Sequence, residues 1–313
     1  MKFRILVTGS SGFVGSSVVS ALAEDGHYVR AASRRPYKSV NECRVDWVQL
    51  PDLRNEVDWN PFVADMDFVI HLAANAHRDL SDTDEYLAVN LSATMNLAHA
   101  CRRQMVKRLI FASSIGAQTG PIANHIVTEA DEPRPMTAYD RAKLAAEEAI
   151  KYSAVPYTIL RPVVVYGPGA KANIASLMRI SAFPLPLPLG AFKNQRSLLA
   201  IDNLVQAVRF CIASPETTNQ TYIVCDREPI SLADMFATLR RAAGKPPLLV
   251  SVPPFVFKGI ISLVGKSALW DRMAGELVAS SEKLQRAGWF PPIETRAGLS
   301  AMMKATLTFD RAG

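Results

Sequence analysis

The chain begins with a short apolar run that leads directly into three evenly spaced glycines. "FRILVTG" covers residues 3–9 and has the composition of a buried strand. "TGSSGFVG" then places Gly9, Gly12 and Gly15 three residues apart, and a helical pattern follows from about Phe13 to Asp25. This strand–turn–helix order predicts the first unit of an α/β fold.

Each glycine of this turn has its own physical task. Gly9 can make the tight turn, Gly12 lets the backbone approach a pyrophosphate, and Gly15 lets the helix sit close to the strand. Amides at the start of the helix then face the phosphates. The spacing is GxxGxxG rather than the GxGxxG of the standard dinucleotide fingerprint. We predict a dinucleotide-binding turn, with a glycine-rich turn without a ligand as the alternative. Its candidate cofactor contacts are Gly9, Ser11, Gly12, Phe13, Val14 and Gly15.

Strand-like runs and helical patterns alternate through the first half of the chain. A long helix is expected over about 84–104, and further strands are expected within 28–33, 43–50, 67–74, 107–114 and 156–167. Continuous apolar strands between helices indicate a parallel sheet that is covered on both faces. We therefore predict an α/β fold with a doubly wound, Rossmann-type parallel sheet.

The second half has a different character. Prolines crowd "AFPLPLPLG" at residues 182–190, which predicts an extended loop, before a helix at 201–214 and a strand at 221–226. We predict that residues 1–168 form the dinucleotide-binding domain, with 197–226 returning to it. Residues 169–196 and 227–313 would form a smaller C-terminal α/β lobe that binds the substrate.

The end of the second strand bears on the choice between the two nicotinamide cofactors. The fingerprint expects an acidic residue there, because a carboxylate bonds the ribose 2′-hydroxyl of NAD. "AASRRP" instead supplies Ser33, Arg34 and Arg35. A guanidinium pairs with the 2′-phosphate of NADP in a bidentate way. The sequence therefore favours NADP, and NAD bound without an acidic partner is the alternative.

A tyrosine and a lysine one helical turn apart suit hydride chemistry. "TAYDRAKLAAEE" places Tyr139 four residues before Lys143. Free tyrosine, with a pKa of about 10, is a poor base at neutral pH, and a nearby ammonium lowers that pKa. "IFASSIG" ends the preceding strand with Ser113 and Ser114, at the edge where such folds bind ligands. We predict a proton-transfer pair beside a serine that polarises the reacting oxygen. Surface residues on an amphipathic helix are the alternative.

These motifs together resemble an extended short-chain dehydrogenase/reductase of the nucleotide-sugar epimerase/dehydratase family. The resemblance covers essentially the whole chain. It rests on "TGSSGFVG", "PDLRN", "VIHLAA", "YLAVN", "FASS", "YDRAK", "LRPVVVYGPG", "RSLLAIDNL" and "LQRAGWFPP".

The resemblance implies roles for individual residues. Tyr139 is the general acid/base, Lys143 holds the ribose hydroxyls and lowers the tyrosine pKa, Ser114 bonds the reacting oxygen, and Ser113 lies near the nicotinamide. Further implied cofactor contacts are Asp52 and Leu53 at the adenine, Leu72, Ala73 and Ala74 along the middle of the cofactor, Asn90 and Pro162. Asn90 can alternatively tie its helix to a neighbouring loop.

Implied substrate contacts lie in the second half. Arg196 matches an arginine that grips a diphosphate, Asn173 is a contact in the lobe, and Arg272 is a second clamp. The spacing from Arg272 to "SSEK" departs from the usual pattern, so a surface charge is the alternative there.

The loop after the serine bears on the reaction. Dehydratases of this family follow the serine with an Asp-Glu pair, whereas Ser114 is followed by Ile115, Gly116 and Ala117. Typical 4-epimerases continue with "VYG", and this chain has "IGAQTG". The segment 167–203 resembles a subgroup that reduces the 4-keto group of UDP-linked 6-deoxy-N-acetylhexosamines, as in quinovosamine synthesis.

We therefore expect a nucleotide-sugar 4-ketoreductase in which Tyr139 donates the proton and Ser114 holds the oxygen. A UDP-hexose or UDP-N-acetylhexosamine 4-epimerase with tightly bound NAD is the alternative. A reductase of small aldehydes would leave Arg196 without a diphosphate. A redox-sensing binding protein would need no proton relay.

Composition narrows the partners. The net charge of the chain is +6. Its Lys and Arg residues are scattered along the sequence rather than arranged in a stripe, so no nucleic-acid partner is expected. Prolines and lysines interrupt the apolar stretch 250–270, which favours a packed helix over stable membrane insertion. The helices around 84–104 and 138–152 resemble those that pair in homodimers of the family, so a homodimer is expected.

The cysteines bear on metals and location. Cys43, Cys101, Cys211 and Cys225 lie far apart, and no cluster with histidine suggests a metal. Buried thiols in a reducing compartment are expected, and the first residues already have strand character, so we expect a cytoplasmic protein.

Overall fold

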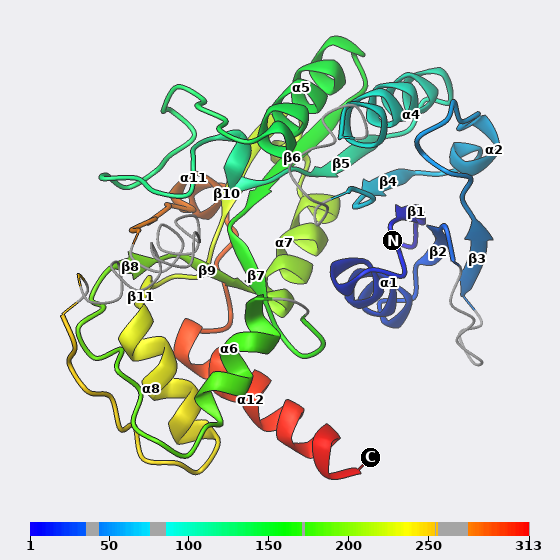
Figure 1. Cartoon of the computed structure of the whole chain (residues 1–313). Coiled ribbons are helices and arrows are strands. Elements are labelled where there is room, and N and C mark those ends of the chain that lie inside the picture. Colours follow the sequence, from blue (N-terminus) through cyan, green and yellow to red (C-terminus); the bar gives the residue numbers. More distant parts are fainter. Residues whose placement is uncertain (36–43, 76–85, 171–172, 254, 256–274, 313) are drawn as a thin grey trace.

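A seven-stranded parallel sheet runs through the middle of the structure (Figure 1). The computed structural model describes residues 1–35, 44–75, 86–170, 173–253, 255 and 275–312. The strand order is β10-β6-β5-β4-β1-β2-β3, with every neighbouring pair parallel. The strands are β1 (Arg4–Thr8), β2 (Tyr28–Ser33), β3 (Val45–Gln49), β4 (Phe68–His71), β5 (Arg108–Ala112), β6 (Tyr157–Pro162) and β10 (Gln220–Val224). This order is the doubly wound arrangement expected from the sequence, which is confirmed.

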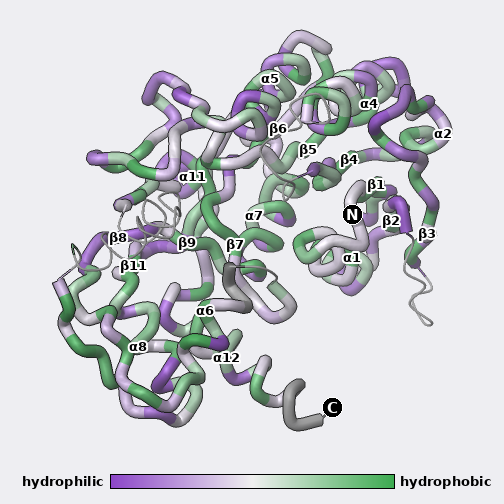
Figure 2. The backbone as a smooth tube through the Cα atoms, in the orientation of Figure 1, coloured by the Kyte–Doolittle hydropathy of each residue, from purple (hydrophilic) through white to green (hydrophobic). Residues whose placement is uncertain are grey.

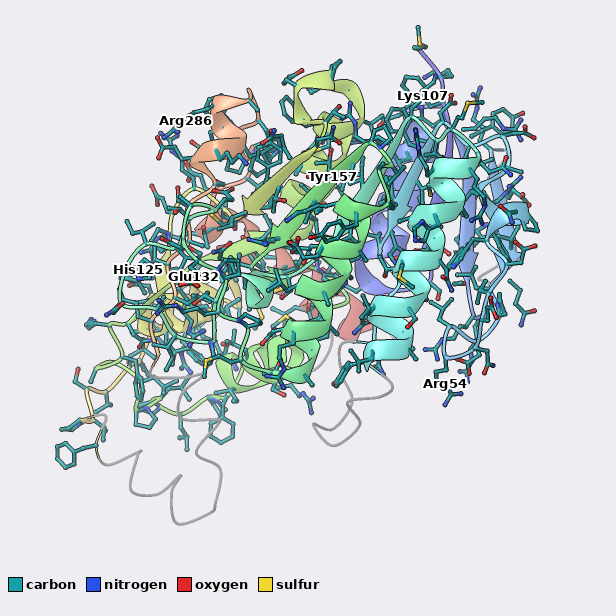
Figure 3. All side chains as sticks on the ribbon, turned by 90° about the horizontal axis from the view of Figure 1, so that it is seen from above. Arg54, Lys107, His125, Glu132, Tyr157 and Arg286 are labelled. Atoms are coloured by element: carbon teal, nitrogen blue, oxygen red, sulfur yellow. The ribbon has the colours of Figure 1, made fainter. Side chains whose placement is uncertain are left out.

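Helices cover both faces of the sheet. On one face α1 (Phe13–Glu24) packs beside α7 (Ile201–Ala213). On the other face lie α2 (Asn60–Val63), the π-helical turn η1 (Leu87–Ser92), α4 (Ala93–Arg103) and α5 (Ala138–Tyr152). Figure 3 shows α4 and α5 side by side along this face.

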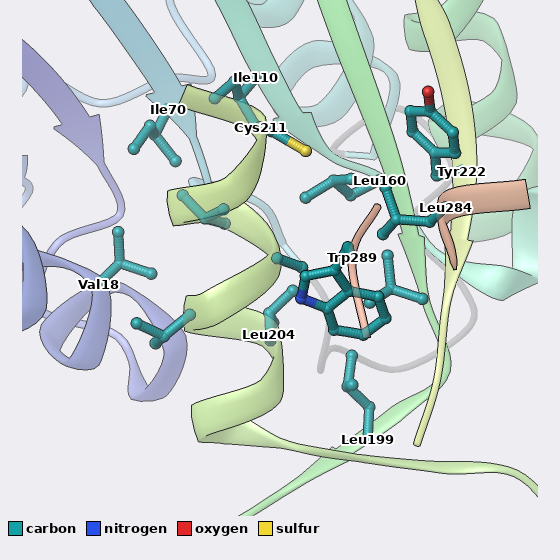
Figure 4. Close-up of a cluster of buried hydrophobic side chains, with 14 of the residues drawn as sticks. Val18, Ile70, Ile110, Leu160, Leu199, Leu204, Cys211, Tyr222, Leu284 and Trp289 are labelled. Atoms are coloured by element: carbon teal, nitrogen blue, oxygen red, sulfur yellow. The ribbon is translucent and has the colours of Figure 1, made fainter. Parts of the chain in front are cut away.

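The central strands β1, β4 and β5 are mostly buried on both sides because helices cover both faces, whereas the edge strand β3 is partly exposed. In β1, Ile5 and Val7 join the core cluster under α1 and α7, while Leu6 joins the cluster under α4 and α5. The strands accordingly form hydrophobic segments in the interior of the tube drawing (Figure 2). The first cluster extends from Val18 of α1 to Trp289, which packs near Leu204 of α7 (Figure 4).

The smaller lobe is built from short pieces around its own core. β7 (Val164–Tyr166) pairs with β9 (Leu198–Ala200), and β8 (Gln195–Arg196) pairs antiparallel with β11 (Ile230–Ser231). Its described helices are α6 (Asn173–Ser181), α8 (Leu232–Ala242) and α12 (Thr295–Ala312). α11 (Glu282–Arg286) instead packs against β10 of the main sheet, with Leu284 in the core cluster under α1 and α7. The 3₁₀ turns among the described residues are η2 (Ile115–Ala117) and η3 (Pro215–Thr217). Phe236 and Leu239 of α8 pack with Leu299 and Met302 of α12.

One buried arginine holds the proline-rich loops of the lobe. Arg240 is only 1% exposed, and its guanidinium donates to the carbonyl oxygens of Phe183 (2.9 Å), Leu185 (3.3 Å) and Pro246 (2.9 Å). Backbone hydrogen bonds also join these loops, since the amide of Leu187 donates to the carbonyl oxygen of Leu248 (2.9 Å). The guanidinium adds side-chain hydrogen bonds that hold the same loops to α8.

The structure departs from the sequence expectation at one strand. The run 156–167 forms two strands in different sheets, because after Pro162 the chain leaves the main sheet and β7 pairs with β9. Most of the stretch 250–270 lies outside the described residues. β10 returns to the main sheet beside β6, and the division of the chain at residue 168 stays a prediction. Among the described helices, none has the length and apolar character needed to cross a bilayer.

The core between α1 and the sheet gives a stability prediction. Leu22→Ala should lower the free energy of unfolding by about 2–5 kcal/mol, because Leu22 is 1% exposed and its removal leaves a cavity. Glu24→Ala on the exposed side of the same helix should cost no more than about 0.5 kcal/mol. Urea unfolding followed by circular dichroism measures both, and equal losses would contradict this packing.

Candidate active site

The predicted site residues gather at one edge of the main sheet. All seven strands are parallel, so their carboxyl ends lie on the same side, which we call the carboxyl edge. The chain order reverses between β1 and β4, which are neighbours in the sheet. Ligands of open α/β sheets bind outside the strand ends at such a reversal. The segments 9–15, 33–35, 72–74 and 113–114 follow β1, β2, β4 and β5 at this edge, where β6 ends in Pro162.

Steric contacts require glycine at two positions of the first turn. Gly9 has φ +70°, and a Cβ there would lie 2.7 Å from the backbone nitrogen of Ala73. A Cβ on Gly15 would lie 2.1 Å from the carbonyl oxygen of Gly9. Gly12, the N-cap of α1, has more room, since its Cβ would meet that oxygen at 3.2 Å. The tight turn and the close helix approach predicted for Gly9 and Gly15 therefore have a steric basis.

The same turn offers donors to a phosphate. α1 begins at Phe13 without a side-chain cap, so the amides of its first turn have no partners within the helix. The hydroxyl of Ser10 is buried without a hydrogen-bond partner. These residues fit the pyrophosphate of a dinucleotide. Ser11 is exposed, Phe13 packs against the lobe core, and Val14 packs against the core under α1. Sequence reasoning missed Ser10, because glycine spacing does not show which serine is buried.

The residues expected near the adenosine lie beyond β2 and β3. Ser33 is buried and donates to the carbonyl oxygen of Arg35 (2.9 Å), while the side chains of Arg34 and Arg35 are exposed. The carboxylate of Asp52 accepts from Arg54, which lowers the pKa of that carboxyl to about 2. Leu53 is buried in the core cluster under α4 and α5.

A buried chain of hydrogen bonds joins the loops after β1 and β4 to the start of α4 on the cofactor side. Thr8 Oγ1 lies 2.7 Å from Nδ1 of His71 and accepts from the amides of Leu72 and Ala73, so the turns after β1 and β4 are fixed together. Nε2 of His71 lies 3.0 Å from the hydroxyl of Thr94. Burial lowers the pKa of His71 to about 3, so the ring is neutral.

Asn90 continues this network in the π-helical turn. Thr94 donates to the carbonyl oxygen of Asn90 (2.8 Å). The amide side chain of Asn90 accepts from the backbone of Asn75 (2.9 Å) and donates back to it (3.2 Å). In the described chain Asn90 thus ties its helix to the loop after β4, the alternative that the sequence left open. Ala74 is exposed in that loop.

Ser113 and Ser114 are placed differently. Ser113 is buried, and its hydroxyl donates to Oε1 of Glu147 (2.5 Å). Ser114 is half-buried at the start of η2, and its oxygen accepts from the amide of Gly116 (3.0 Å), which leaves its proton available to another acceptor. A Cβ on Gly116 would lie 1.8 Å from Oδ1 of Asp140, so glycine lets η2 abut the start of α5.

Tyr139 and Lys143 lie on the first turns of α5, which begins with a capping box of Thr137 and Asp140. The Lys143 ammonium donates to the carbonyl oxygen of Ala112 (2.7 Å) and lies 6.0 Å from the Tyr139 ring centroid. Burial lowers the pKa of Lys143 to about 7. Burial also raises the pKa of Tyr139. Within the described chain, desolvation therefore outweighs the lowering of the tyrosine pKa that the sequence predicted.

A second buried network lies behind the serines. Nε and Nη2 of Arg161 in β6 donate to the two carboxylate oxygens of Glu147 (2.9 and 2.5 Å). Arg161 Nη1 donates to Gln118, which donates to the carbonyl oxygen of Asp131 (2.6 Å). Sequence reasoning missed these residues. An arginine inside the apolar run "YTILRP" was the available signal, because a buried charge needs a partner.

The predicted substrate residues are far from the serines in the sequence. In the structure, the strand of Arg196 and the loop 118–137 both contact the segment around Leu277. Arg196 belongs to β8, which bridges to Leu277, and burial lowers the pKa of its guanidinium. The loop 118–137 reaches the same segment, since the amides of Ala123 and Val127 donate to the carbonyl oxygens of Glu276 and Val278 (both 2.8 Å). His125 and Glu132 mark this loop in Figure 3. Asn173 begins α6, and Arg272 lies outside the described residues.

Metal ligation finds no support in the described part of the chain. Its His, Cys, Asp and Glu side chains form no group of three or more that could hold an ion. Cys101, Cys211 and Cys225 are buried free thiols, and Cys43 lies outside the described residues.

The chain is similar to several known proteins. The chain is 35% identical to a UDP-glucose 4-epimerase from Vibrio cholerae over 98% of this chain and 96% of the relative. It is 25% identical to an N-acetyl-alpha-D-glucosaminyl-diphospho-ditrans,octacis-undecaprenol 4-epimerase from Escherichia coli O157:H7 over 78% of this chain and 74% of the relative. Among solved structures, MoeE5 in complex with UDP-glucose and NAD superposes with a TM-score of 0.76, at 25% identity, over 98% of this chain and 99% of the other. The model of the NAD dependent epimerase/dehydratase family matches residues 5–225, and the chain belongs to that family.

Proposed function

We propose that this enzyme is a 4-epimerase of a UDP-linked hexose or N-acetylhexosamine that keeps NAD bound between turnovers. The observation that carries the proposal is the 35% identity to a UDP-glucose 4-epimerase along 98% of the chain. The solved relative that holds UDP-glucose and NAD supports it. The sequence alone favoured a 4-ketoreductase, and these comparisons favour the alternative instead.

The arrangement of the chain's own groups suits this reaction. Bound NAD would supply a reversible acceptor for the hydride of carbon 4, which is the chemistry that inversion at this carbon requires. Tyr139 accepts the hydroxyl proton in the first half and donates it back in the second, while Ser114 donates a hydrogen bond to the oxygen. Burial raises the pKa of Tyr139, so a phenolate there would need a nearby positive charge to stabilise it. The Lys143 ammonium, one helical turn away, can supply that charge.

We assign the remaining contacts by position. The turn 9–15 and Ser10 would hold the pyrophosphate, and Leu72, Ala73, Ser113 and Pro162 line the carboxyl edge where the cofactor would lie. Arg196 would grip the diphosphate of the substrate from the lobe, because its position matches the diphosphate-binding arginine that the resemblance implies and guanidinium groups pair with phosphates in a bidentate way.

A 4-ketoreductase that uses NADPH is the second candidate. The observation that favours it is the end of β2, where Ser33, Arg34 and Arg35 provide two exposed guanidinium groups and no carboxylate. These suit a 2′-phosphate better than a 2′-hydroxyl. A reductase also exchanges its cofactor at every turnover, whereas an epimerase does not need to.

Extraction of the purified protein distinguishes the two candidates. We expect close to one NAD per chain to be released on denaturation, and UDP-glucose or UDP-N-acetylglucosamine to be converted to its 4-epimer without added cofactor. Chromatography of the extract and of the sugar nucleotides measures both. An empty protein that binds NADPH in preference to NADH would overturn the epimerase and support the reductase.

The proton relay is tested by one substitution and its matched control. Tyr139→Phe should lower kcat by about 10²- to 10⁴-fold, because the ring stays in place while the proton is lost. Cofactor binding should persist. Tyr152→Phe at the exposed end of the same helix should leave kcat unchanged, since Tyr152 is 86% exposed. Turnover that survives in Tyr139→Phe would exclude this tyrosine as the acid/base.

We also propose a cytoplasmic homodimer that pairs through η1, α4 and α5. These elements cover one face of the sheet and carry exposed apolar side chains, among them Leu87 (41% exposed) and Met95 (38% exposed). Two copies that pack these helices together would remove this apolar surface from water.

The proposed dimer interface is tested by placing charged side chains on it. Leu87→Glu combined with Met95→Glu should convert a dimer into a monomer, because two carboxylates per chain would be buried without partners. Light scattering after size exclusion measures the mass. Ile180→Glu on the lobe, at a site that is 47% exposed, is the control and should stay dimeric. A wild-type monomer at micromolar concentration would contradict the proposal.

A further inference from the structure

The ion pair between Glu147 and Arg161 is the most deeply buried charge pair among those that the structure describes. Its side chains are 0% and 5% exposed. Burying two charges costs several kcal/mol per ion, and their attraction with good geometry does little more than offset that cost. The bidentate contact has such geometry, with Nε and Nη2 of Arg161 each on a different oxygen of Glu147. Stability alone is therefore a weak reason for this pair.

The pair contacts the candidate site at Ser113 and lies one helical turn from Lys143. Oε1 of Glu147 also accepts from the hydroxyl of Ser113 (2.5 Å), at the end of β5. Glu147 lies one helical turn after Lys143 on the buried side of α5. The ammonium of Lys143 in turn donates to the carbonyl oxygen of Ala112, the residue before Ser113. One carboxylate is thus linked both to the strand end and to the helix that carry the proposed catalytic groups.

We propose that Glu147 is a positioning residue of this site, which fixes Ser113 by a hydrogen bond and keeps Lys143 in its charged form by its own negative charge. The inference deepens the proposed function, because it concerns the same proton relay. Glu147 touches neither substrate nor cofactor and acts through these two residues.

The surroundings of Lys143 support the electrostatic part. From β4 comes His71, which is neutral, and from β5 come the Phe111 ring, 4.5 Å from the ammonium, and the Ala112 carbonyl. Tyr139 lies on the same helix, with Tyr86, the residue before η1, packed edge-on against its ring. Arg161 of β6 is also positive, but among the charged groups that the structure describes only Glu147 shifts the pKa of Lys143.

Two opposing effects therefore act on Lys143. Burial lowers the pKa of Lys143, and the charge of Glu147 raises it, with a resulting value of about 7. Removal of the Glu147 charge leaves burial unopposed, so the ammonium should lose its proton at a lower pH.

The test is an NMR titration of the protein without cofactor, with lysines labelled at carbon ε and Lys143 assigned by its loss in Lys143→Met. Glu147→Gln keeps the shape and the acceptor for Ser113 but removes the charge. We expect the Lys143 midpoint, near pH 7 in the wild type, to fall by about one unit or more. Glu148→Gln, next along the helix but exposed, is the control and should leave the midpoint unchanged.

An uncompensated Arg161 can unfold the Glu147→Gln variant, since breaking a buried pair is strongly destabilising. Arg161→Met added to Glu147→Gln removes the second charge, and the midpoint should still fall. An unchanged midpoint in either folded variant overturns the proposal, because a purely structural role would not affect the titration of Lys143.

Activity then separates this inference from the proposed function. Where the wild type turns over a UDP-sugar, the decline of kcat on the alkaline side should begin at a lower pH in Glu147→Gln, because neutral Lys143 no longer supports the Tyr139 phenolate. A midpoint that falls in a protein that epimerises no sugar would uphold the positioning role and refute the 4-epimerase.

Discussion

The site depends on how closely the first helix approaches the first strand. Gly15 packs against the carbonyl oxygen of Gly9 at a distance that admits no Cβ, so α1 can approach the turn this closely only with glycine there. Thr8, the residue before the turn, bonds His71 and the amides that follow β4, which fixes the second loop relative to the first. Hydrogen bonds from Thr94 to Asn90, and from Asn75 to Asn90, fix the loop ending at Asn75 to the same network. The relative positions of the loops on the cofactor side are thus fixed by backbone packing and by hydrogen bonds between uncharged groups.

Features whose geometry is contained in local spacing could be predicted from the sequence. The glycines of the first turn, the pair Tyr139 and Lys143, and the parallel sheet itself belong to this class, because helix and strand periods convert spacing into position. The network behind the serines does not. Gln118 and Arg161 are 43 residues apart, and their contact exists only because β6 lies beside β5 in the sheet. The pKa of Tyr139 also escaped prediction, because spacing shows a nearby ammonium and does not show how deeply the ring is buried.

The choice of reaction was the part that local pattern could least decide. A reductase and an epimerase need the same hydride path, the same proton relay and the same grip on a diphosphate. They differ in whether the ketone can turn within the site and whether the cofactor leaves. Those properties depend on the shape of the lobe and of the loop 118–137, which is held to the segment 276–280 by backbone hydrogen bonds.

The tether of the proline-rich loops has a consequence for how such a lobe can diverge. Arg240 holds these loops through the carbonyl oxygens of Phe183, Leu185 and Pro246, and a carbonyl oxygen is the same in every amino acid. The hydrogen bonds of Arg240 therefore do not depend on which side chains occupy these three positions. A descendant of this chain could exchange them for other residues, and so present a different surface at the lobe, while the loops kept their course.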